Sequence, residues 1–295
     1  MRAAMTQETR GMWLGVGGVA IFSLTLPFTR IAVAELNPVL VALGRAVVAA
    51  MASALLLWHG GAARPTAAQV RALLVTALGV VIGFPVLSAI AMRYVPASHG
   101  AVVLGILPLA TALFGALRFG ERPSAGFWFA ALLGSGIVVA FAVSQGGGAL
   151  QAADFALFAA VVAAAMGYAE GARLSRTMGG HQVISWALVL SLPLLLPASA
   201  WLAWHYGASA SPKAWMGFAY VSLFSMFIGF FFWYKGLALG GIARVGQVQL
   251  LQPFLTLVGA ALIDGETPDA RHFLFAFAVI AVVAFGRRMA IRRPA

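Results

Sequence analysis

The sequence PLATALFGALRFGERP at residues 108–123 returns 145 positions later as PFLTLVGAALIDGETP at residues 253–268. Seven of these sixteen aligned positions are identical, where roughly one or two would agree by chance in a chain of such biased composition. A gap of one residue extends the match to Ile82-Gly83-Phe84 against Ile228-Gly229-Phe230. Because the offset is close to half of the 295 residues, the sequence predicts two related halves, residues 1–146 and 147–295.

Composition places both halves in a membrane. Of all residues 62% are hydrophobic and 9% are charged, against roughly 45–50% and 25% in a soluble domain. Ten mostly apolar stretches are long enough to cross a hydrocarbon core of roughly 30 Å as helices. They are residues 11–34, 38–59, 70–92, 97–117, 125–143, 153–172, 182–204, 214–234, 245–263 and 272–286. The sequence therefore predicts an all-α integral membrane protein with ten transmembrane helices, and it excludes a water-soluble enzyme.

The repeat and the number of spans together predict that the two halves have opposite orientations. Each half holds five spans, and because five is odd the second half enters the membrane from the other side. The turns Gly120–Pro123 and Gly265–Pro268 then lie on opposite faces. Two inverted five-helix repeats in one membrane domain are the usual architecture of alternating-access transporters. We therefore expect a secondary transporter.

With ten spans both termini lie on one side, and Lys and Arg residues mark that side as cytoplasmic. One set of alternate connections carries fourteen of the nineteen Lys and Arg residues, the other carries four, and Arg45 falls inside the second span. We expect a multi-pass protein of a bacterial-type inner membrane with both termini cytoplasmic. A signal peptide cleaved after Ala32-Val33-Ala34 is disfavoured, because the apolar run is long and carries Arg30 near its end.

With its ten spans and the repeated segments 108–123 and 253–268, the sequence resembles the EamA-type branch of the drug/metabolite transporter superfamily. The resemblance extends over the whole length of the chain. Each half closes with a Pro-x-x-Thr helix followed by Gly-Glu-x-Pro. Residues 167–176, GYAEGARLSR, and residues 246–253, GQVQLLQP, are similar to the subgroup that includes aromatic amino-acid exporters. The resemblance implies export of small metabolites through a central cavity. Aromatic or other large neutral amino acids are the first expectation, and other amino acids, amines or drugs are the alternative.

Polar side chains inside spans are the first candidates for contacting a solute, because such groups are costly in lipid. Gln249, Gln252 and Thr256 share one helix face at i, i+3 and i+7. Pro253 lies beside them and can kink the span and free a backbone carbonyl. This face can hold the polar end of an amino acid. The alternative is hydrogen bonding to a neighbouring span, at about 0.6–2 kcal/mol per bond.

Aromatic and hydroxyl residues of other spans are the second set of candidates. A cavity with aromatic walls and hydroxyl groups suits an apolar solute with one polar head. The alternative is packing against lipid or in an interfacial belt. The candidates for substrate binding are Phe22, Phe84, Ser88, Tyr168, Trp186, Ser225, Gly229 and Trp233.

Three ionisable residues each allow two interpretations. Arg45 can bind a substrate carboxylate or Glu35, or its long side chain can snorkel to the outer interface. His99 can line the outer mouth of the transport path and bind substrate there, or it can be a solvated turn residue. Glu170 can carry a proton, or it can pair with Arg173 one turn later.

Prolines and glycines within the spans indicate where helices bend or approach closely. The glycine pairs Gly11/Gly15 and Gly236/Gly240 have the spacing that permits close helix packing. Prolines can act as hinges or gates for rocking of one half against the other, or can merely kink a span. The candidate hinges are Pro27, Pro85, Pro108 and Pro253.

Several functions are disfavoured by what the sequence lacks. It has no cysteine, no His-Glu-x-x-His motif and no Gly-x-x-x-x-Gly-Lys motif, so we expect no metal, no cofactor and no nucleotide. An intramembrane enzyme and a passive channel are the remote alternatives. The net charge of +11 follows from topology, and we expect no nucleic-acid partner. The expected partners are a small-molecule substrate and the lipid bilayer, in a monomer or weak dimer that works by facilitated diffusion or by proton coupling through Glu170 or His99.

Overall fold

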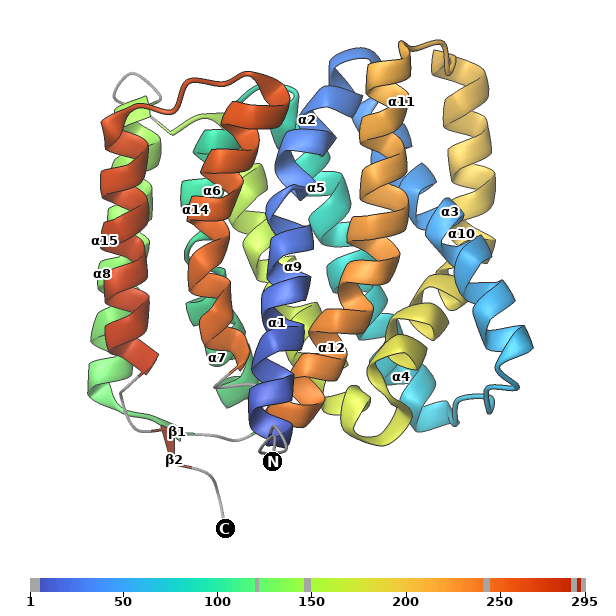
Figure 1. Ribbon diagram of the computed structural model, residues 1–295, viewed down its shortest axis with the longest axis horizontal. Helices are drawn as coiled ribbons and strands as arrows, with labels where there is room; N and C mark the ends of the chain where they lie inside the picture. The colour runs from blue at the N-terminus through green and yellow to red at the C-terminus, as the bar shows by residue number, and fades with distance from the viewer. Residues whose placement is uncertain (1–5, 120–121, 146–149, 241–244, 288–290, 293–295) are drawn as a thin grey trace, which may run out of the picture.

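The computed structural model describes residues 6–119, 122–145, 150–240, 245–287 and 291–292, and within them it is a bundle of apolar helical rods (Figure 1). Among the described residues, seven helices are long and apolar enough to cross a membrane, and three shorter apolar helices cover residues 128–144, 248–264 and 270–282. Each of the ten predicted spans coincides with one rod. The prediction of an all-α fold with ten helical spans is confirmed.

The first half of the chain forms five rods, several of which are divided into segments. They are α1 (Gln7–Ser23) with α2 (Thr25–Glu35), α3 (Pro38–His59), α4 (Ala67–Thr76) with the π-helix η1 (Ala77–Gly83) and α5 (Phe84–Met92), α6 (Ala97–Leu104) with α7 (Leu107–Phe119), and α8 (Ala125–Gln145).

The second half repeats this order. Its rods are α9 (Ala152–Met178), α10 (Gly180–Tyr206), α11 (Pro212–Ala219) with the π-helix η2 (Tyr220–Ile228) and α12 (Gly229–Gly240), the 3-10 helix η3 (Gly246–Leu251) with α14 (Gln252–Gly259) and the π-helix η4 (Ala260–Asp264), and α15 (Ala270–Arg287). A two-residue antiparallel pair joins β1 (Arg122–Pro123) to β2 (Ile291–Arg292).

Capping residues start several rods. Asn37 accepts hydrogen bonds from the backbone N–H groups of residues 39 and 40, directly before Pro38. Thr66 forms a capping box with Gln69 at the start of α4. Ser211 caps α11 before Pro212. Such side chains satisfy N–H groups that have no partner within the helix, so these residues fix where each rod begins.

The rods divide at related positions in the two halves. The fourth rod is interrupted at Gly105-Ile106 and the ninth changes from η3 to α14 after Leu251, which is the position that the 145-residue offset gives. The π-helices η1 and η2 end immediately before Phe84 and Gly229, positions that lie within the matched tripeptides. The first rod breaks at Leu24, whereas α9 is continuous.

The four candidate hinge prolines stand just after these divisions. Pro85, Pro108 and Pro253 are each the second residue of a helical segment, and Pro27 is the third residue of α2. Proline is tolerated in a first turn because its missing N–H would have no partner there. These prolines therefore mark the breaks and do not interrupt a regular helix.

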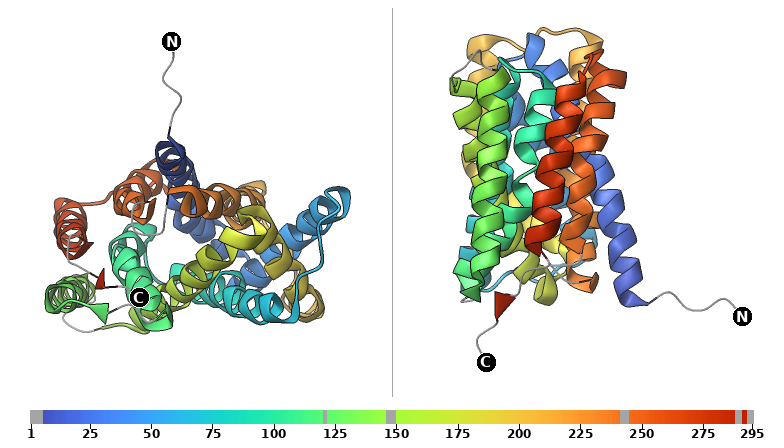
Figure 2. Two further views of the ribbon diagram at one scale, coloured as in Figure 1. Left: turned by 90° about the horizontal axis from the view of Figure 1, so that it is seen from below. Right: turned by 90° about the vertical axis from the view of Figure 1, so that its left-hand side faces the viewer.

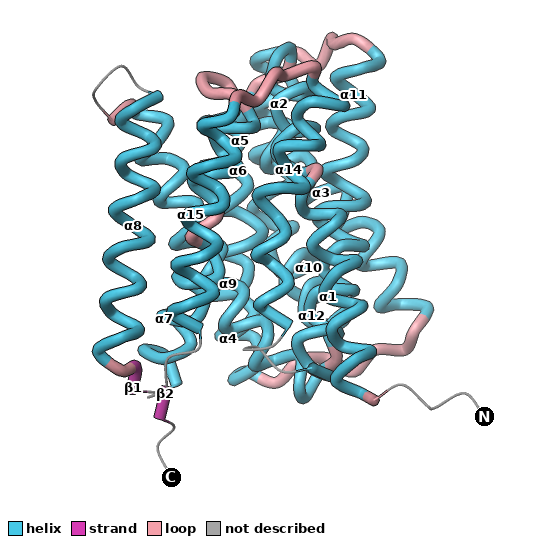
Figure 3. Tube along the Cα trace, turned by 60° about the vertical axis from the view of Figure 1, so that its left-hand side comes forward, coloured by secondary structure: helices cyan, strands magenta, loops and turns pink. Residues whose placement is uncertain are grey.

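Helices of the two halves pack in pairs. The pairs are α1 with α12, α9 with η1 and α5, α3 with α10, α6 with α14, and α8 with α15. The views in Figure 2 and the tube in Figure 3 place α8 and α15 side by side at one edge of the bundle, with most of the loops at its two ends.

The predicted close approach at the glycine pairs is confirmed. A Cβ atom on Gly11 would lie 2.5 Å from the backbone nitrogen of Gly240, and one on Gly236 would lie 3.0 Å from the backbone nitrogen of Gly15. The backbones of α1 and α12 therefore touch where side chains would separate them.

Helix α1 begins and α15 ends at the same end of the bundle, which we call the terminal end, and α9 runs opposite to α1 (Figure 1). The other end, which we call the opposite end, holds the connections around residues 36, 94, 209 and 267. Gly120, Glu121, Arg244 and the predicted boundary at residues 146 and 147 lie outside the described residues.

Candidate functional site

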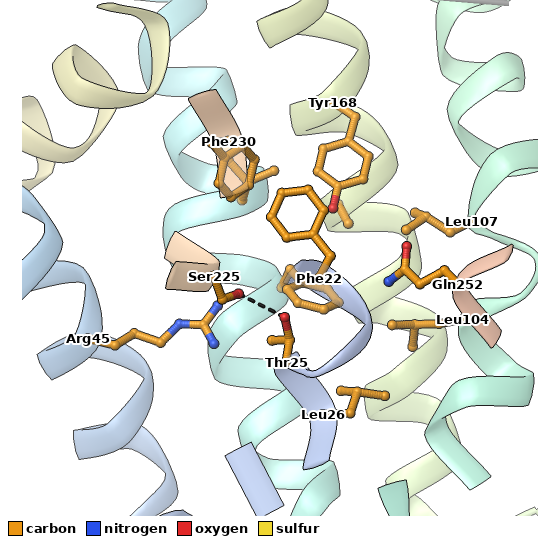
Figure 4. A pocket seen from close by; sticks show the side chains of 13 residues that line it. Phe22, Thr25, Leu26, Arg45, Leu104, Leu107, Tyr168, Ser225, Phe230 and Gln252 are labelled. Carbon is orange, nitrogen blue, oxygen red and sulfur yellow. Dashed lines mark hydrogen bonds between the residues drawn. The ribbon is translucent and has the colours of Figure 1, made fainter. Parts of the chain in front are cut away.

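A cavity lies where the divided rods of both halves meet (Figure 4). Its walls come from α1, α2, α3, η1, α5, α6 and α7 of the first half and from α9, η2, α12 and α14 of the second. The lining residues are Phe22, Thr25, Leu26, Arg45, Val80, Phe84, Leu104, Leu107, Ala164, Tyr168, Ser225, Phe230 and Gln252.

Aromatic rings form one wall of this cavity. Phe22 stacks on Tyr168 with ring centroids 6.3 Å apart and meets Phe230 at 5.0 Å. Trp233 lies behind them, 5.7 Å from Tyr168. Arrangements of this kind offer a largely apolar surface with a few polar edges, which suits an aromatic or large aliphatic body.

Polar groups lie across from that wall. The hydroxyl groups of Thr25 and Ser225 are 2.8 Å apart and join α2 to η2. Arg45 is 2% exposed, and Figure 4 shows its guanidinium group reaching toward these hydroxyls. Because the side chain ends at the cavity in mid-bundle, the alternative that Arg45 snorkels to the outer interface is wrong. Gln252 faces the cavity from the first turn of α14.

The cavity is nearly closed around its own side chains. Its free volume is about 20 Å³, which is roughly what one water needs. A solute with an aromatic body therefore needs the walls to move apart before it can enter.

Sequence reasoning named six of the lining residues: Phe22, Arg45, Phe84, Tyr168, Ser225 and Gln252. Other candidates lie nearby but outside the lining. Gln249 is buried, and neither its amide nitrogen nor its amide oxygen has a hydrogen-bond partner within the described residues. Thr256 is buried further along α14.

The remaining candidates pack against other parts of the protein and do not line the cavity. Ser88 donates a hydrogen bond to the carbonyl of Phe84 at 2.6 Å. Trp186 is partly buried on α10. A Cβ on Gly229 would lie 2.7 Å from the ring of Phe22, so this glycine makes room for the aromatic wall. Trp233 supports that wall from behind.

His99 lies at the opposite end, in a separate pocket of about 430 Å³. Its Nε2 is 2.6 Å from the Asp154 carboxylate, and the two side chains are 6% and 1% exposed. The alternative of a solvated turn residue is therefore wrong. His272 also lines this pocket and bonds Asp269; this hydrogen bond and backbone N–H donors hold the pKa of Asp269 below its usual value.

Ionic contacts join the two halves at both ends of the bundle. At the opposite end the Arg30 guanidinium is 3.1 Å from Asp264 and 3.4 Å from Glu266. Glu266 also accepts hydrogen bonds from the backbone of Ala97 and Ser98, at 2.6 and 2.9 Å. This carboxylate thereby caps α6 from the other half of the chain.

Near the terminal end Glu170 is 2% exposed and binds two arginines. Arg173 pairs with it at i+3, as the sequence predicts, and Arg118 of α7 lies 3.3 Å away. Glu170 is therefore bound in an ion-pair network within the described structure, unlike an isolated proton carrier.

The sequence interpretation missed Thr25, Leu26, Val80 and Ala164 of the lining, and it did not single out Leu104, Leu107 or Phe230 as site residues. It also missed the buried Asp154. The only sequence signal for Asp154 is its place in the first turn of a span, three residues after Gln151, where it caps the helix. Apolar lining residues look like any other core residue.

The model of the EamA-like transporter family matches residues 9–142 and again residues 151–286. The chain belongs to this family. The two family matches flank the predicted boundary between the halves. Family membership together with the apolar helices makes the chain a multi-pass membrane transporter.

A relative from Bacillus subtilis (strain 168), described as the uncharacterized transporter YdeK, is 48% identical over 286 residues, which cover 97% of this chain and 100% of the relative. A solved crystal structure of another protein superposes with a TM-score of 0.65 at 17% identity, over 93% of this chain and 95% of that one. The second likeness concerns the fold alone.

Proposed function

We propose that this EamA-family transporter exports small metabolites with an apolar body and a polar head, by alternating access around the central cavity. Aromatic and other large neutral amino acids are the first class to test, and other amino acids, amines or drugs are the second. The observation that carries the proposal is the cavity itself, because both halves line it at the points where their rods divide.

An inverted relation between the halves supports alternating access. Under such a relation the first rod corresponds to the sixth and the third to the eighth. The packing of α1 on α12 then corresponds to the packing of α9 on η1 and α5, and both contacts are present. One sequence packed in two orientations can exchange roles between two states, which is how such a carrier would expose the cavity first to one side and then to the other.

The ionic contacts at the two ends are suited to act as gates in this cycle. Arg30 with Glu266 and Arg118 with Glu170 each connect one half to the other. Opening a path at either end separates the halves there and breaks that contact. The nearly filled cavity between closed ends corresponds to an occluded state.

Orientation and driving force complete the proposal. The Lys and Arg distribution favours cytoplasmic termini in an inner membrane, so solute would enter from the terminal end and leave at the opposite end. Facilitated diffusion down the solute gradient fits the pairing of Glu170. Proton coupling through the His99–Asp154 pair is the alternative, since a buried imidazole and carboxylate can exchange protons with the pocket beside them.

The test is solute counterflow in proteoliposomes with a radiolabelled panel of aromatic and large neutral amino acids. Gln252→Ala should slow uptake about 10-fold, the effect of losing one hydrogen bond to a bound solute. Gln182→Ala, on α10 and outside the cavity, is the matched control. If no compound of the panel shows counterflow, the substrate class is refuted. If folded Gln252→Ala shows full uptake, Gln252 does not bind the solute.

A further inference from the structure

Arg45 is a buried cation to which the described residues give no counter-charge. It lies eight residues into α3, its side chain is 2% exposed, and its Nε is buried without a hydrogen-bond partner. No ion pair joins it to any acidic side chain within the described residues. A charge buried in this way is unfavourable unless something binds it.

The acidic side chains that the structure describes are engaged elsewhere. Glu35 accepts hydrogen bonds from the backbone N–H and the hydroxyl of Ser211, so the predicted alternative of an Arg45–Glu35 pair is wrong. The others bind His99, Arg30, His272 or the two arginines around Glu170. Within the described residues, Arg45 thus faces a cavity and has no acidic side chain to bind.

We propose that Arg45 binds an anionic group of the transported solute and that the carrier accepts monocarboxylates with an aromatic or large apolar body. This inference rests on the proposed function of the cavity. A carboxylate can bind the guanidinium group through two N–H donors. The hydroxyls of Thr25 and Ser225 lie beside it; because one of them donates to the other, the second keeps a free O–H as a further donor to the carboxylate. The solute body would lie against Phe22 and Phe230 (Figure 4).

The rest of the lining gives a positive group on the solute little to bind. None of the thirteen lining residues is acidic, so an ammonium group finds only neutral acceptors such as the amide oxygen of Gln252. The charge on Arg45 also repels a cation in a low-dielectric cavity. An amine should therefore be dispensable on the solute, whereas the carboxylate should be required.

The experiment compares three compounds with one aromatic body as competitors of counterflow in proteoliposomes of the full chain. They are 3-phenylpropanoate, phenylalanine and 2-phenylethylamine. We expect the two carboxylates to compete at concentrations about 30-fold lower than the amine, the effect of leaving a buried charge unpaired in a complex. Arg45→Gln should abolish this preference, Arg45→Lys should keep part of it, and Arg71→Gln on the exposed face of α4 should leave it unchanged.

Thermal unfolding of the same samples separates binding from folding. Because Arg45→Gln removes an unpaired buried charge, its midpoint should equal or exceed that of the native chain. Equal competition by amine and carboxylates, or an unchanged carboxylate preference in Arg45→Gln, would overturn the proposed role of Arg45. Neither result would contradict the proposed transport function. Failure of the native chain to carry any aromatic solute would instead overturn the proposed function.

Discussion

Substitution of Gly79 by alanine tests whether the cavity depends on close packing between η1 and α9. A Cβ on Gly79 would lie 2.5 Å from the carbonyl oxygen of Ala163, 2.7 Å from the nitrogen of Gly167 and 2.8 Å from its Cα. All three are backbone atoms, so no side-chain rotation can relieve the overlap. Restoring ordinary contact at 3.4 Å requires η1 and α9 to separate by about 0.9 Å.

The separation reaches the cavity directly, because Val80 follows Gly79 and Tyr168 follows Gly167, and both line it. Overpacking of this size typically costs about 1–3 kcal/mol. Alanine also recovers up to about 1 kcal/mol of helix propensity relative to glycine. The matched control is Gly136→Ala in α8, where a Cβ meets nothing within 4 Å. The difference between the two variants isolates the packing term.

The assay is reversible unfolding in mixed micelles, followed by counterflow with the surviving folded protein. Gly79→Ala should be less stable than Gly136→Ala by about 1–3 kcal/mol and should transport more slowly, while Gly136→Ala transports normally. A stability difference below about 0.5 kcal/mol, the range of neutral surface substitutions, would refute the argument that backbone contact sets the cavity wall.

Three further substitutions test the contacts at the two ends of the bundle. Glu266→Gln should destabilise the folded state by about 1 kcal/mol, because α6 loses its charged cap and Arg30 loses a partner; an unchanged unfolding midpoint would contradict this. Asp154→Ala should cost about 1–3 kcal/mol by leaving His99 buried without its partner, measured in the same unfolding assay, and a cost near zero would show that the pair is open to water. Glu170→Gln should lower the free energy of unfolding by less than about 1 kcal/mol, because both arginines around it are at least half exposed. A larger loss of stability in the same assay would mean that these ion pairs are shielded from water more than the exposure of the arginines indicates.

The fold could be predicted from the sequence because its strongest signals are local and additive. Apolar run length fixes the spans, and breaker residues such as Asn37-Pro38 fix their ends. The repeat fixes which rods correspond. Glycine spacing predicted one interface, and an i, i+3 pair predicted the contact between Glu170 and Arg173.

The site was predicted only in part, because the rotation of each rod about its axis is set by packing against other rods. Arg45 and Gln252 were recognised as costly groups inside spans, but nothing in the neighbouring sequence shows that Arg45 reaches the cavity. His99 and Asp154 are 55 residues apart, and their contact depends on how α6 meets α9. The π-helices η1 and η2 have no composition that distinguishes them from regular helix.

The scaffold of the two halves is near-symmetric, whereas the polar side chains that line the cavity are not. This difference bears on how a solute is held. Phe84 and Phe230 occupy matched positions in the two halves, and both line the cavity. Gln252 corresponds to Leu107, and the positions that correspond to Arg45 are Leu190 or Ser191, neither of them basic. A near-symmetric scaffold can change which side is open while its two arrangements stay close in energy. A single guanidinium group on α3 would keep the carboxylate of a solute at the same place in both arrangements, so the halves could move around a solute that does not itself turn over.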